Sequence, residues 1–415
     1  MPELESSTSW PALRRFLYTR EPVNPPIAAP RARLVPGLVG RADVELVVVS
    51  NPETPDRTLA IKGLGSSPLP WLVESARLLE RMGATDLAYP CNTAHYFLHR
   101  ATSEDLTLRA PLVDMIHETV AAVAAAGLSR IGLLATTGTI STGLYQDAFE
   151  ARGVSVVVPE QVPGRPEGPD LDGEGRVAPD AYARHGASPG RALDRPGLGA
   201  LVSFLVDLLG EQEGLVMETV RGALGVKAGY TAGVPVQLAA EAGRRLVARG
   251  AQALVLGCTE LPLVFTGRSA TLEGRDVPLV DPTAVVAERL RARPGPHGIA
   301  GGLGPEATID LLVKMGAPRE FTDLLYDILR ATVAELGARR DQDHLKLFAI
   351  AGPDIVGAAR RLAGAGAGFL VLTRDAAGDE RAVEAATGLP VVVDRADRQA
   401  GVEVVRRAVA VPATP

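Results

Sequence analysis

The chain has 415 residues, 46% of them hydrophobic, which is enough for two or three packed lobes. Its 49 acidic and 43 basic residues give a formal net charge of −6, so no basic surface is expected to follow a phosphate backbone, and we expect no nucleic-acid partner. No apolar stretch approaches the ~20 residues that cross a bilayer, and the acidic start lacks the apolar core of a signal peptide. We therefore expect a soluble cytoplasmic protein with no membrane partner.

The first forty residues contain scattered prolines and no sustained period, which predicts an N-terminal arm over 1–40. From Val44 onward, short apolar runs alternate with helical stretches, a pattern typical of βαβ units with parallel sheets. A polar stretch rich in glycine and proline over 161–199 is typical of an inserted loop. We expect strands at Val44–Ser50, Asp86–Tyr89, Leu112–Met115, Arg130–Ala135, Val154–Val158, Ala253–Leu256 and Val277–Val280.

An internal repeat divides this region into two lobes, 41–160 and 200–292. Residues 76–91 predict a helix, a Gly-Ala turn and a strand that ends in a cysteine, and residues 243–258 repeat the pattern in register. In both copies an aspartate follows the cysteine by 23 residues. A third copy near the C-terminus keeps the scaffold but has Arg374 at the cysteine position.

The two cysteines, Cys91 and Cys258, cannot form a disulfide framework, and each is predicted at the carboxyl end of a parallel strand, where α/β proteins bind ligands. If the lobes face each other, one thiolate can remove a proton from a carbon while the opposite thiol delivers another. Such a site also needs donors for a substrate carboxylate, and Asn92 and the nearby threonines are suitable. The alternative is that both cysteines are small buried residues, but their matched positions argue against it.

The histidines are assigned no chemistry of their own. His95 could either tune the Cys91 thiolate or cap a helix. The others show no ligand spacing and are expected to be ordinary surface or core residues: His99, His117, His185, His297 and His344.

Tyr89–His95 and Leu256–Glu260 resemble the two cysteine signatures of the cofactor-independent aspartate/glutamate racemases, and they are closer to the aspartate racemase branch. Asn51–Thr58, Ala135–Thr139 and Arg221 with Lys227 match in the same order. The resemblance covers roughly residues 43 to 290 apart from the insertion. It implies an α/β fold of two pseudo-symmetric parallel-sheet lobes.

The resemblance also implies a function: racemisation of an acidic amino acid, aspartate or glutamate, without PLP, metal or another cofactor. Cys91 and Cys258 would be the acid/base residues. Arg57 and Lys227 would hold the side-chain carboxylate of the substrate, although Arg57 could instead form a surface pair. The family also makes a homodimer conceivable. The remaining residues expected to bind substrate are Asn51, Asn92, Thr93, Thr137, Thr139, Thr259 and Glu260.

The chain departs from the family at its start, where the glycine-rich first strand and helix are missing. Gly298–Thr308 resembles that opening, and Arg339–His344 resembles the segment that leads to the second strand. Either 297–345 folds back to complete the first lobe, or 297–415 forms a degenerate third α/β lobe. The glycines at 301–304 would allow a close approach to a carboxylate, and a plain turn explains them equally well.

Two other functions remain open. The same scaffold could serve an isomerase or decarboxylase of a small dicarboxylate. The rearrangement and the long insertion are also compatible with a catalytically silent binding or regulatory protein.

Overall fold

The computed structural model describes residues 35–101, 108–159, 182–183, 195–209, 212–302, 304–331 and 346–394. The chain divides into two compact units. Within the described residues, unit 1 contains Gly127–Ile140 and Phe149–Val280. Unit 2 contains the chain up to Ala126, Ser141–Ala148 and the chain from Asp281 onward. No helix among the described residues is both long enough and apolar enough to span a membrane.

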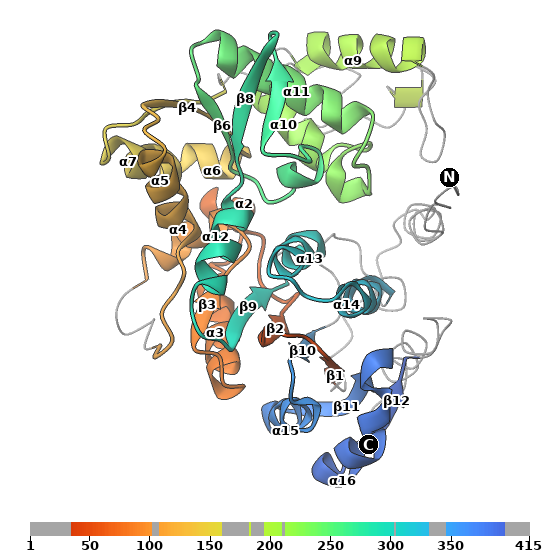
Figure 1. Cartoon of the computed structure of the whole chain (residues 1–415). Coiled ribbons are helices and arrows are strands. Elements are labelled where there is room, and N and C mark those ends of the chain that lie inside the picture. Colours follow the sequence, from red (N-terminus) through yellow and green to blue (C-terminus); the bar gives the residue numbers. More distant parts are fainter. Residues whose placement is uncertain are drawn as a thin grey trace. The chain divides into compact units, whose positions relative to one another are not determined.

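Unit 1 is built on a five-stranded sheet in the order β5-β4-β6-β8-β7. Three of its strands, β4, β6 and β8, are labelled in Figure 1. The first four strands run parallel, and β7 and β8 form an antiparallel hairpin whose tight turn places Glu273 and Gly274 at positive φ. The strands are β4 (Arg130–Leu134), β5 (Ser155–Val157), β6 (Ala253–Leu256), β7 (Ser269–Leu272) and β8 (Arg275–Val280).

One face of this sheet is covered by helices whose apolar residues recur every three or four positions. In α11, Leu238, Ala242 and Leu246 lie on one stripe and pack in a core with Leu254 and Leu256 of β6. The helices of unit 1 are α9 (Arg195–Leu209), α10 (Gln212–Arg221), η1 (Val226–Ala228), α11 (Val234–Ala248) and η2 (Leu261–Leu263); α6 (Thr137–Ser141) begins in unit 1.

Unit 2 contains a seven-stranded sheet in the order β12-β11-β1-β10-β2-β9-β3. All neighbours are parallel except β10 and β2, so the sheet consists of two parallel groups that run in opposite directions. Its strands are β1 (Val35–Gly40), β2 (Leu46–Ser50), β3 (Asp86–Ala88), β9 (His297–Gly301), β10 (Leu347–Ala351), β11 (Ala367–Leu372) and β12 (Val391–Val393).

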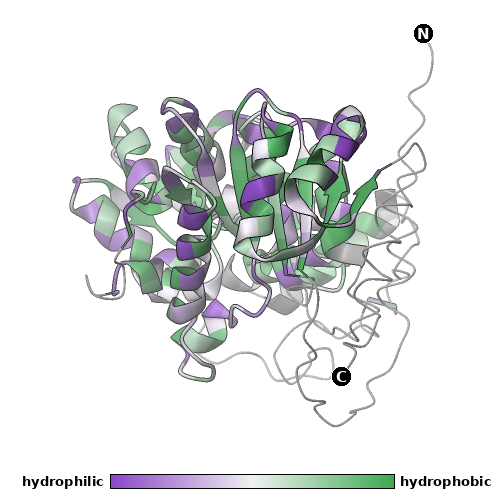
Figure 2. Ribbon diagram, turned by 90° about the horizontal axis from the view of Figure 1, so that it is seen from below, coloured by the Kyte–Doolittle hydropathy of each residue, from purple (hydrophilic) through white to green (hydrophobic). Residues whose placement is uncertain are grey.

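Helices cover both faces of the seven-stranded sheet because its strands are apolar on both sides. Val47 and Val49 of β2 pack in a core with α3 and α15, whereas Leu46 and Val48 pack on the opposite face with α12 to α14. Figure 2 shows the strands mostly in hydrophobic green and the helices in mixed colours. The helices are α2 (Arg57–Ile61), α3 (Leu69–Arg81), α4 (Asn92–Leu98), α5 (Met115–Ala125), α7 (Leu144–Glu150, reaching into unit 1), α12 (Pro282–Arg291), α13 (Pro305–Lys314), α14 (Arg319–Ala331), α15 (Ile355–Ala365), η3 (Arg374–Asp379) and α16 (Glu380–Thr387).

The structure confirms the α/β class with parallel βα units, and two local expectations were wrong. Val35–Gly40, assigned to the arm, forms β1, an interior strand of the seven-stranded sheet, where its apolar Leu38 and Val39 are fully buried. Leu112–Met115 is not a strand: Leu112 makes a single bridge to Leu87, and Asp114 then caps α5 by accepting from Ile116 and His117 N–H. The 161–199 insertion lies outside the described residues except for 182–183 and the start of α9.

The strands beyond residue 290 join the sheet of unit 2. β9 lies between β2 and β3, with Gly301 in register with Ser50. β10 and β11 flank β1. Because β11 belongs to the oppositely directed group, Arg374 follows its strand at the edge of the sheet opposite to Cys91. Arg339–His344 lies outside the described residues.

Candidate active site

Cys91 occupies the position predicted from the sequence, beyond the carboxyl end of β3. It is the N-cap residue of α4 and only 8% exposed. Its Sγ lies 3.3 Å from Thr93 Oγ1, so the hydroxyl can donate a hydrogen bond to a thiolate. The polar partner of this thiol is therefore a neutral group.

Asn92, the next residue, presents a buried donor. Its Oδ1 accepts a 2.6 Å hydrogen bond from the hydroxyl of Tyr145, which fixes the orientation of the amide. Its Nδ2 is buried and has no hydrogen-bond partner among the described residues. Since buried donors are normally satisfied, this one is suited to an oxygen of a bound ligand.

His95 holds α4 against the start of α5. Its Nδ1 lies 3.0 Å from the Cys91 carbonyl oxygen, and its Nε2 accepts a 3.2 Å hydrogen bond from Met115 N–H. The carbonyl requires the proton on Nδ1, and burial lowers the pKa of His95, so the ring is neutral. Of the two expected roles, the contacts favour fixing the helix.

The neighbouring strands bring further predicted residues to this edge. Asn51 follows β2, donates its backbone N–H to the Gly301 carbonyl over 3.4 Å, and accepts from Glu53 N–H through Oδ1. Gly302, with φ +85°, lies against Asn51: a Cβ there would be 2.4 Å from the Asn51 backbone. Only glycine fits, so the glycine requirement comes from contact between the ends of β2 and β9.

Arg57 begins α2 and is 6% exposed, so its side chain is buried rather than on the surface, as one of the two expectations from the sequence had it. Its guanidinium donates to the Pro55 carbonyl over 3.4 Å. The preceding Asp56 caps the helix by accepting from Leu59 N–H. A buried cation thus lies in the same unit as Cys91.

Cys258 has a charged environment, in unit 1. It follows β6 after Gly257, and its Sγ donates a 2.9 Å hydrogen bond to Glu260 Oε2. Thr259 Oγ1 donates to the same oxygen over 3.2 Å, and Lys227 Nζ pairs with Glu260 Oε1 at 3.3 Å. The structure therefore joins four predicted site residues, with Lys227 and Glu260 in contact with each other.

The protonation state of Cys258 follows from these contacts. Burial raises the pKa of the Cys258 thiol well above its usual value, and the charge and hydrogen bond of Glu260 raise it further. The Lys227 ammonium acts in the opposite direction but does not outweigh them. Cys258 is therefore a protonated thiol at neutral pH.

Thr137 and Thr139 lie at the same edge of the unit 1 sheet as Cys258. They belong to α6, which starts just beyond β4, and β4 is the parallel neighbour of β6. Thr137 is half-buried and Thr139 is buried, with its N–H donated to the Thr136 carbonyl over 3.0 Å. Their positions agree with the general rule that the carboxyl ends of parallel strands carry the ligand contacts.

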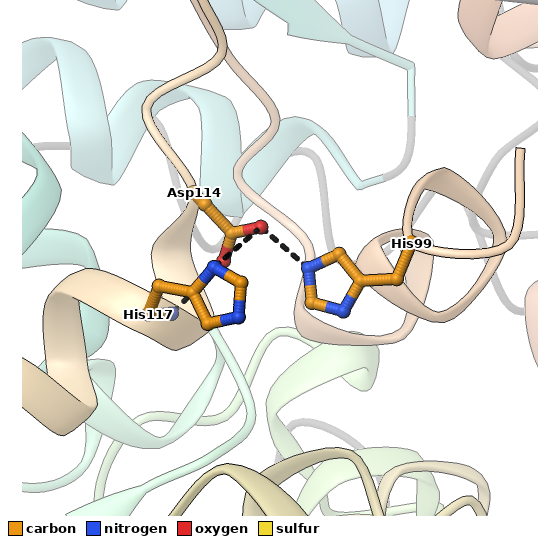
Figure 3. Close-up of side chains that lie close together, drawn as sticks. All are labelled: His99, Asp114 and His117. Carbon is orange, nitrogen blue, oxygen red and sulfur yellow. Dashed lines mark hydrogen bonds and ion pairs between the residues drawn. The ribbon is translucent and has the colours of Figure 1, made fainter. Parts of the chain in front are cut away.

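Two features were missed from the sequence. Tyr145, which orients Asn92, belongs to no motif and could not have been found. His99, Asp114 and His117 form a cluster at the far end of α4 (Figure 3). The Asp-x-x-His spacing of Asp114 and His117, which places both residues on one face of the first turn of α5, was the available signal.

Comparison with known proteins gives one family. The model of the Asp/Glu/Hydantoin racemase family matches residues 31–202 and 214–290, more than half of the chain. The match ends before β9, so the strands β9 to β12 follow it in sequence.

Solved structures with similar folds include three racemases of low sequence identity. The aspartate racemase of Picrophilus torridus is 18% identical over 62% of this chain and 92% of its own, with a TM-score of 0.36. The glutamate racemase of Francisella tularensis, in complex with D-glutamate, is 14% identical over 69% and 95%, with a TM-score of 0.38. A glutamate racemase of Bacillus anthracis is 14% identical over 87% and 96%, with a TM-score of 0.31.

The family assignment rests on the sequence match, which includes both cysteine motifs and their strands. The chain belongs to the Asp/Glu/Hydantoin racemase family, and its enzyme class is that of an amino-acid racemase.

Proposed function

We propose that the chain racemises an acidic amino acid, with Cys91 and Cys258 exchanging protons with the α carbon from opposite faces. The observation that carries this proposal is that each unit holds one buried cysteine just beyond the carboxyl end of a parallel strand. Neither cysteine is in a disulfide, and each has a hydrogen-bonding partner of its own.

The proton balance is simple. In one direction Cys91, as the thiolate, takes the α proton, while Cys258, as the thiol, delivers its proton to the other face of the carbanion. After this turnover Cys91 is a thiol and Cys258 is a thiolate. In the reverse direction Cys258 takes the α proton and Cys91 delivers one. Lys227, paired with Glu260, offsets the negative charge that develops on Cys258.

Donors for the substrate carboxylates come from the same residues. The Nδ2 of Asn92 is buried and available for a carboxylate oxygen. Thr93, Thr137, Thr139 and Thr259 follow the same strands as the cysteines or their neighbour, and the hydroxyls of Thr93 and Thr259 also contact Cys91 and Glu260. Arg57 is a buried cation and Lys227 a partly buried one, and both favour a second carboxylate on the substrate. This argues for a dicarboxylic amino acid, with aspartate preferred on the sequence motifs.

We also propose that the segment from residue 297 completes the lobe that carries Cys91. The support is that β9 pairs with both β2 and β3, and that Gly302 packs against Asn51. The backbone at Gly301 and Gly302 would then form part of the wall of the substrate site. The thiol chemistry requires reduced cysteines, which favours the cytoplasm as the compartment.

The direct test is exchange of the α proton. The purified chain is incubated with L-aspartate or L-glutamate in deuterated water under reducing conditions, and the α-proton signal and the enantiomer ratio are followed together. We expect loss of the signal with accumulation of the D-enantiomer, faster for aspartate.

Other outcomes would identify the alternatives. Exchange without inversion would exclude two-sided proton transfer. The absence of exchange with both substrates would indicate a binding protein, and release of carbon dioxide would indicate a decarboxylase.

A further inference from the structure

We propose that His99, Asp114 and His117 form a binding site for a divalent transition metal of the zinc class in unit 2. One ligand atom of each residue lies within 4.8 Å of the others. His99 is the C-cap residue of α4, and the other two lie at the start of α5. The site is separate from the cysteine chemistry proposed above and does not depend on it.

The distances are close to those of a bound ion. Zinc binds imidazole nitrogen and carboxylate oxygen at roughly 2.0–2.2 Å, so two ligands of a tetrahedral site lie roughly 3.3 Å apart. His117 Nδ1 is 3.7 Å from Asp114 Oδ2, and His99 Nε2 makes a short hydrogen bond to the same oxygen. Figure 3 shows the two rings converging on this carboxylate. Small side-chain movements would admit an ion between the three atoms.

The carboxylate is already oriented for such a role. Asp114 Oδ1 accepts 2.9 Å hydrogen bonds from the backbone N–H groups of Ile116 and His117. This leaves Oδ2 as the oxygen directed at both imidazoles. Hydrogen bonds that fix a ligating carboxylate in this way strengthen metal sites.

The two rings are arranged side by side. Their centroids are 5.0 Å apart and their planes differ by 10°. Because a histidine that ligates through one nitrogen is neutral, the stacked pair carries no mutual repulsion once an ion is bound.

A cavity gives the ion a free coordination position. His99 and His117 line a hollow of about 300 Å³ together with Asp147 and Arg100. The guanidinium of Arg100 lies 3.7 Å from the Tyr96 ring and donates to the Tyr96 carbonyl, so its contacts are with Tyr96. Asp147 adds a negative charge on the wall. Three protein ligands and an accessible cavity match a zinc site whose fourth position holds water.

A bound ion would stabilise α4, the helix that begins with Cys91 and Asn92 and ends at His99. An ion bridging His99 to α5 would reinforce the contact that His95 makes with Met115. The expected consequence is a higher melting temperature of the full-length chain.

The test is zinc binding by the full-length chain, purified without a histidine tag, stripped with a chelator and titrated by calorimetry. We expect one zinc per chain, lost or weakened at least about tenfold in His99→Ala and in His117→Ala, since two remaining ligands do not hold the ion. Arg100→Ala, which lines the same cavity without a ligand atom, should bind as the unchanged chain does. Cobalt should give the intense visible bands of a four-coordinate ion, and these should disappear in His117→Ala.

Loss of zinc binding in the histidine variants can be distinguished from misfolding and from zinc binding by the two cysteines. The His117 side chain is 69% exposed, so its replacement should leave the metal-free melting temperature unchanged. Zinc held by Cys91 or Cys258 would persist in His117→Ala. Equal binding by the unchanged chain and both histidine variants, or no binding by the unchanged chain, would overturn the proposal.

Discussion

The surroundings of the two cysteines differ in charge. Cys91 in unit 2 has the Thr93 hydroxyl at 3.3 Å and the Asn92 amide beside it, all neutral groups. Cys258 in unit 1 has the Glu260 carboxylate at 2.9 Å, which is in turn paired with Lys227. A repeated scaffold has thus acquired two different polar environments; at Cys258, burial and then the Glu260 carboxylate raise the pKa of the thiol. If the proposed two-cysteine mechanism holds, this difference makes Cys258 the proton donor of the resting site.

Removal of either thiol is the strongest test of this assignment. Cys91→Ala and Cys258→Ala should each reduce racemisation by about 10²–10⁴-fold, because a positioned acid or base contributes a factor of that size. Each variant should retain slow α-deuterium exchange in one enantiomer only, and in opposite enantiomers. The measurement is NMR of both enantiomers in deuterated water. Exchange of the same enantiomer by both variants would contradict the division of roles.

Glu260→Gln should shift the pH profile rather than abolish the reaction. After burial, the charge and hydrogen bond of Glu260 are what raise the pKa of Cys258. In Glu260→Gln the pKa of Cys258 is therefore lower, and the thiol loses its proton at a lower pH. For the reaction direction in which Cys258 acts as the acid, the alkaline limb of the kcat/KM profile should move to lower pH. Alkylation of Cys258 at a fixed neutral pH should become faster.

The matched control is Glu273→Gln, which removes a half-exposed carboxylate of the same unit that pairs with Arg244. It should leave the alkaline limb where it is. An equal shift in both variants would mean that general charge, and not the contact with Glu260, sets the protonation of Cys258.

Tyr145→Phe should weaken substrate binding at the Cys91 edge. The change removes the 2.6 Å hydrogen bond that orients Asn92, a loss of about 1 kcal/mol or roughly fivefold. We expect the effect in KM, with kcat changed less. Tyr89→Phe removes a comparable buried hydrogen bond to Leu72 and should lower the melting temperature without raising KM. Equal KM values in the two variants would remove Asn92 from the substrate site.

Thr93→Val should have an effect comparable in size to that of Tyr145→Phe. It deletes a neutral hydrogen bond to Cys91, which contributes about 0.5–1.5 kcal/mol, so kcat/KM should fall roughly two- to tenfold. Because Thr93 carries no charge, the pH profile should keep its shape, unlike that of Glu260→Gln. A large shift of the acidic or the alkaline limb of the pH profile would show that the environments of Cys91 and Cys258 are more alike than their contacts indicate.

The sequence predicted those features that depend on local pattern. The strands before Cys91 and Cys258 were found because apolar runs end in matched Gly-Ala turns and cysteines, and both residues follow the expected strands. Asp114 and Asp281 were part of the repeat, and both prove to be N-caps. Their local hydrogen bonds explain why the spacing recurs.

Features that depend on pairing between distant segments were not predicted. Val35–Gly40 was assigned to the arm because its proline and glycine obscure the strand pattern, yet two later strands flank it. Arg374 keeps the register of the repeat but follows a strand that runs in the opposite direction. The contact of Lys227 with Glu260 joins residues from separate motifs. Local patterns carry no information about any of these pairings.

The insertion of β9 between β2 and β3 has a consequence for the order of synthesis. Most of unit 1 is encoded without interruption between Phe149 and Val280, so its sheet can assemble while the chain is still emerging from the ribosome. The strands that precede it, β2 and β3, must wait for about two hundred further residues before their shared neighbour exists. Nascent chains stalled before residue 297 should therefore carry a folded Cys258 region and an unfinished Cys91 region.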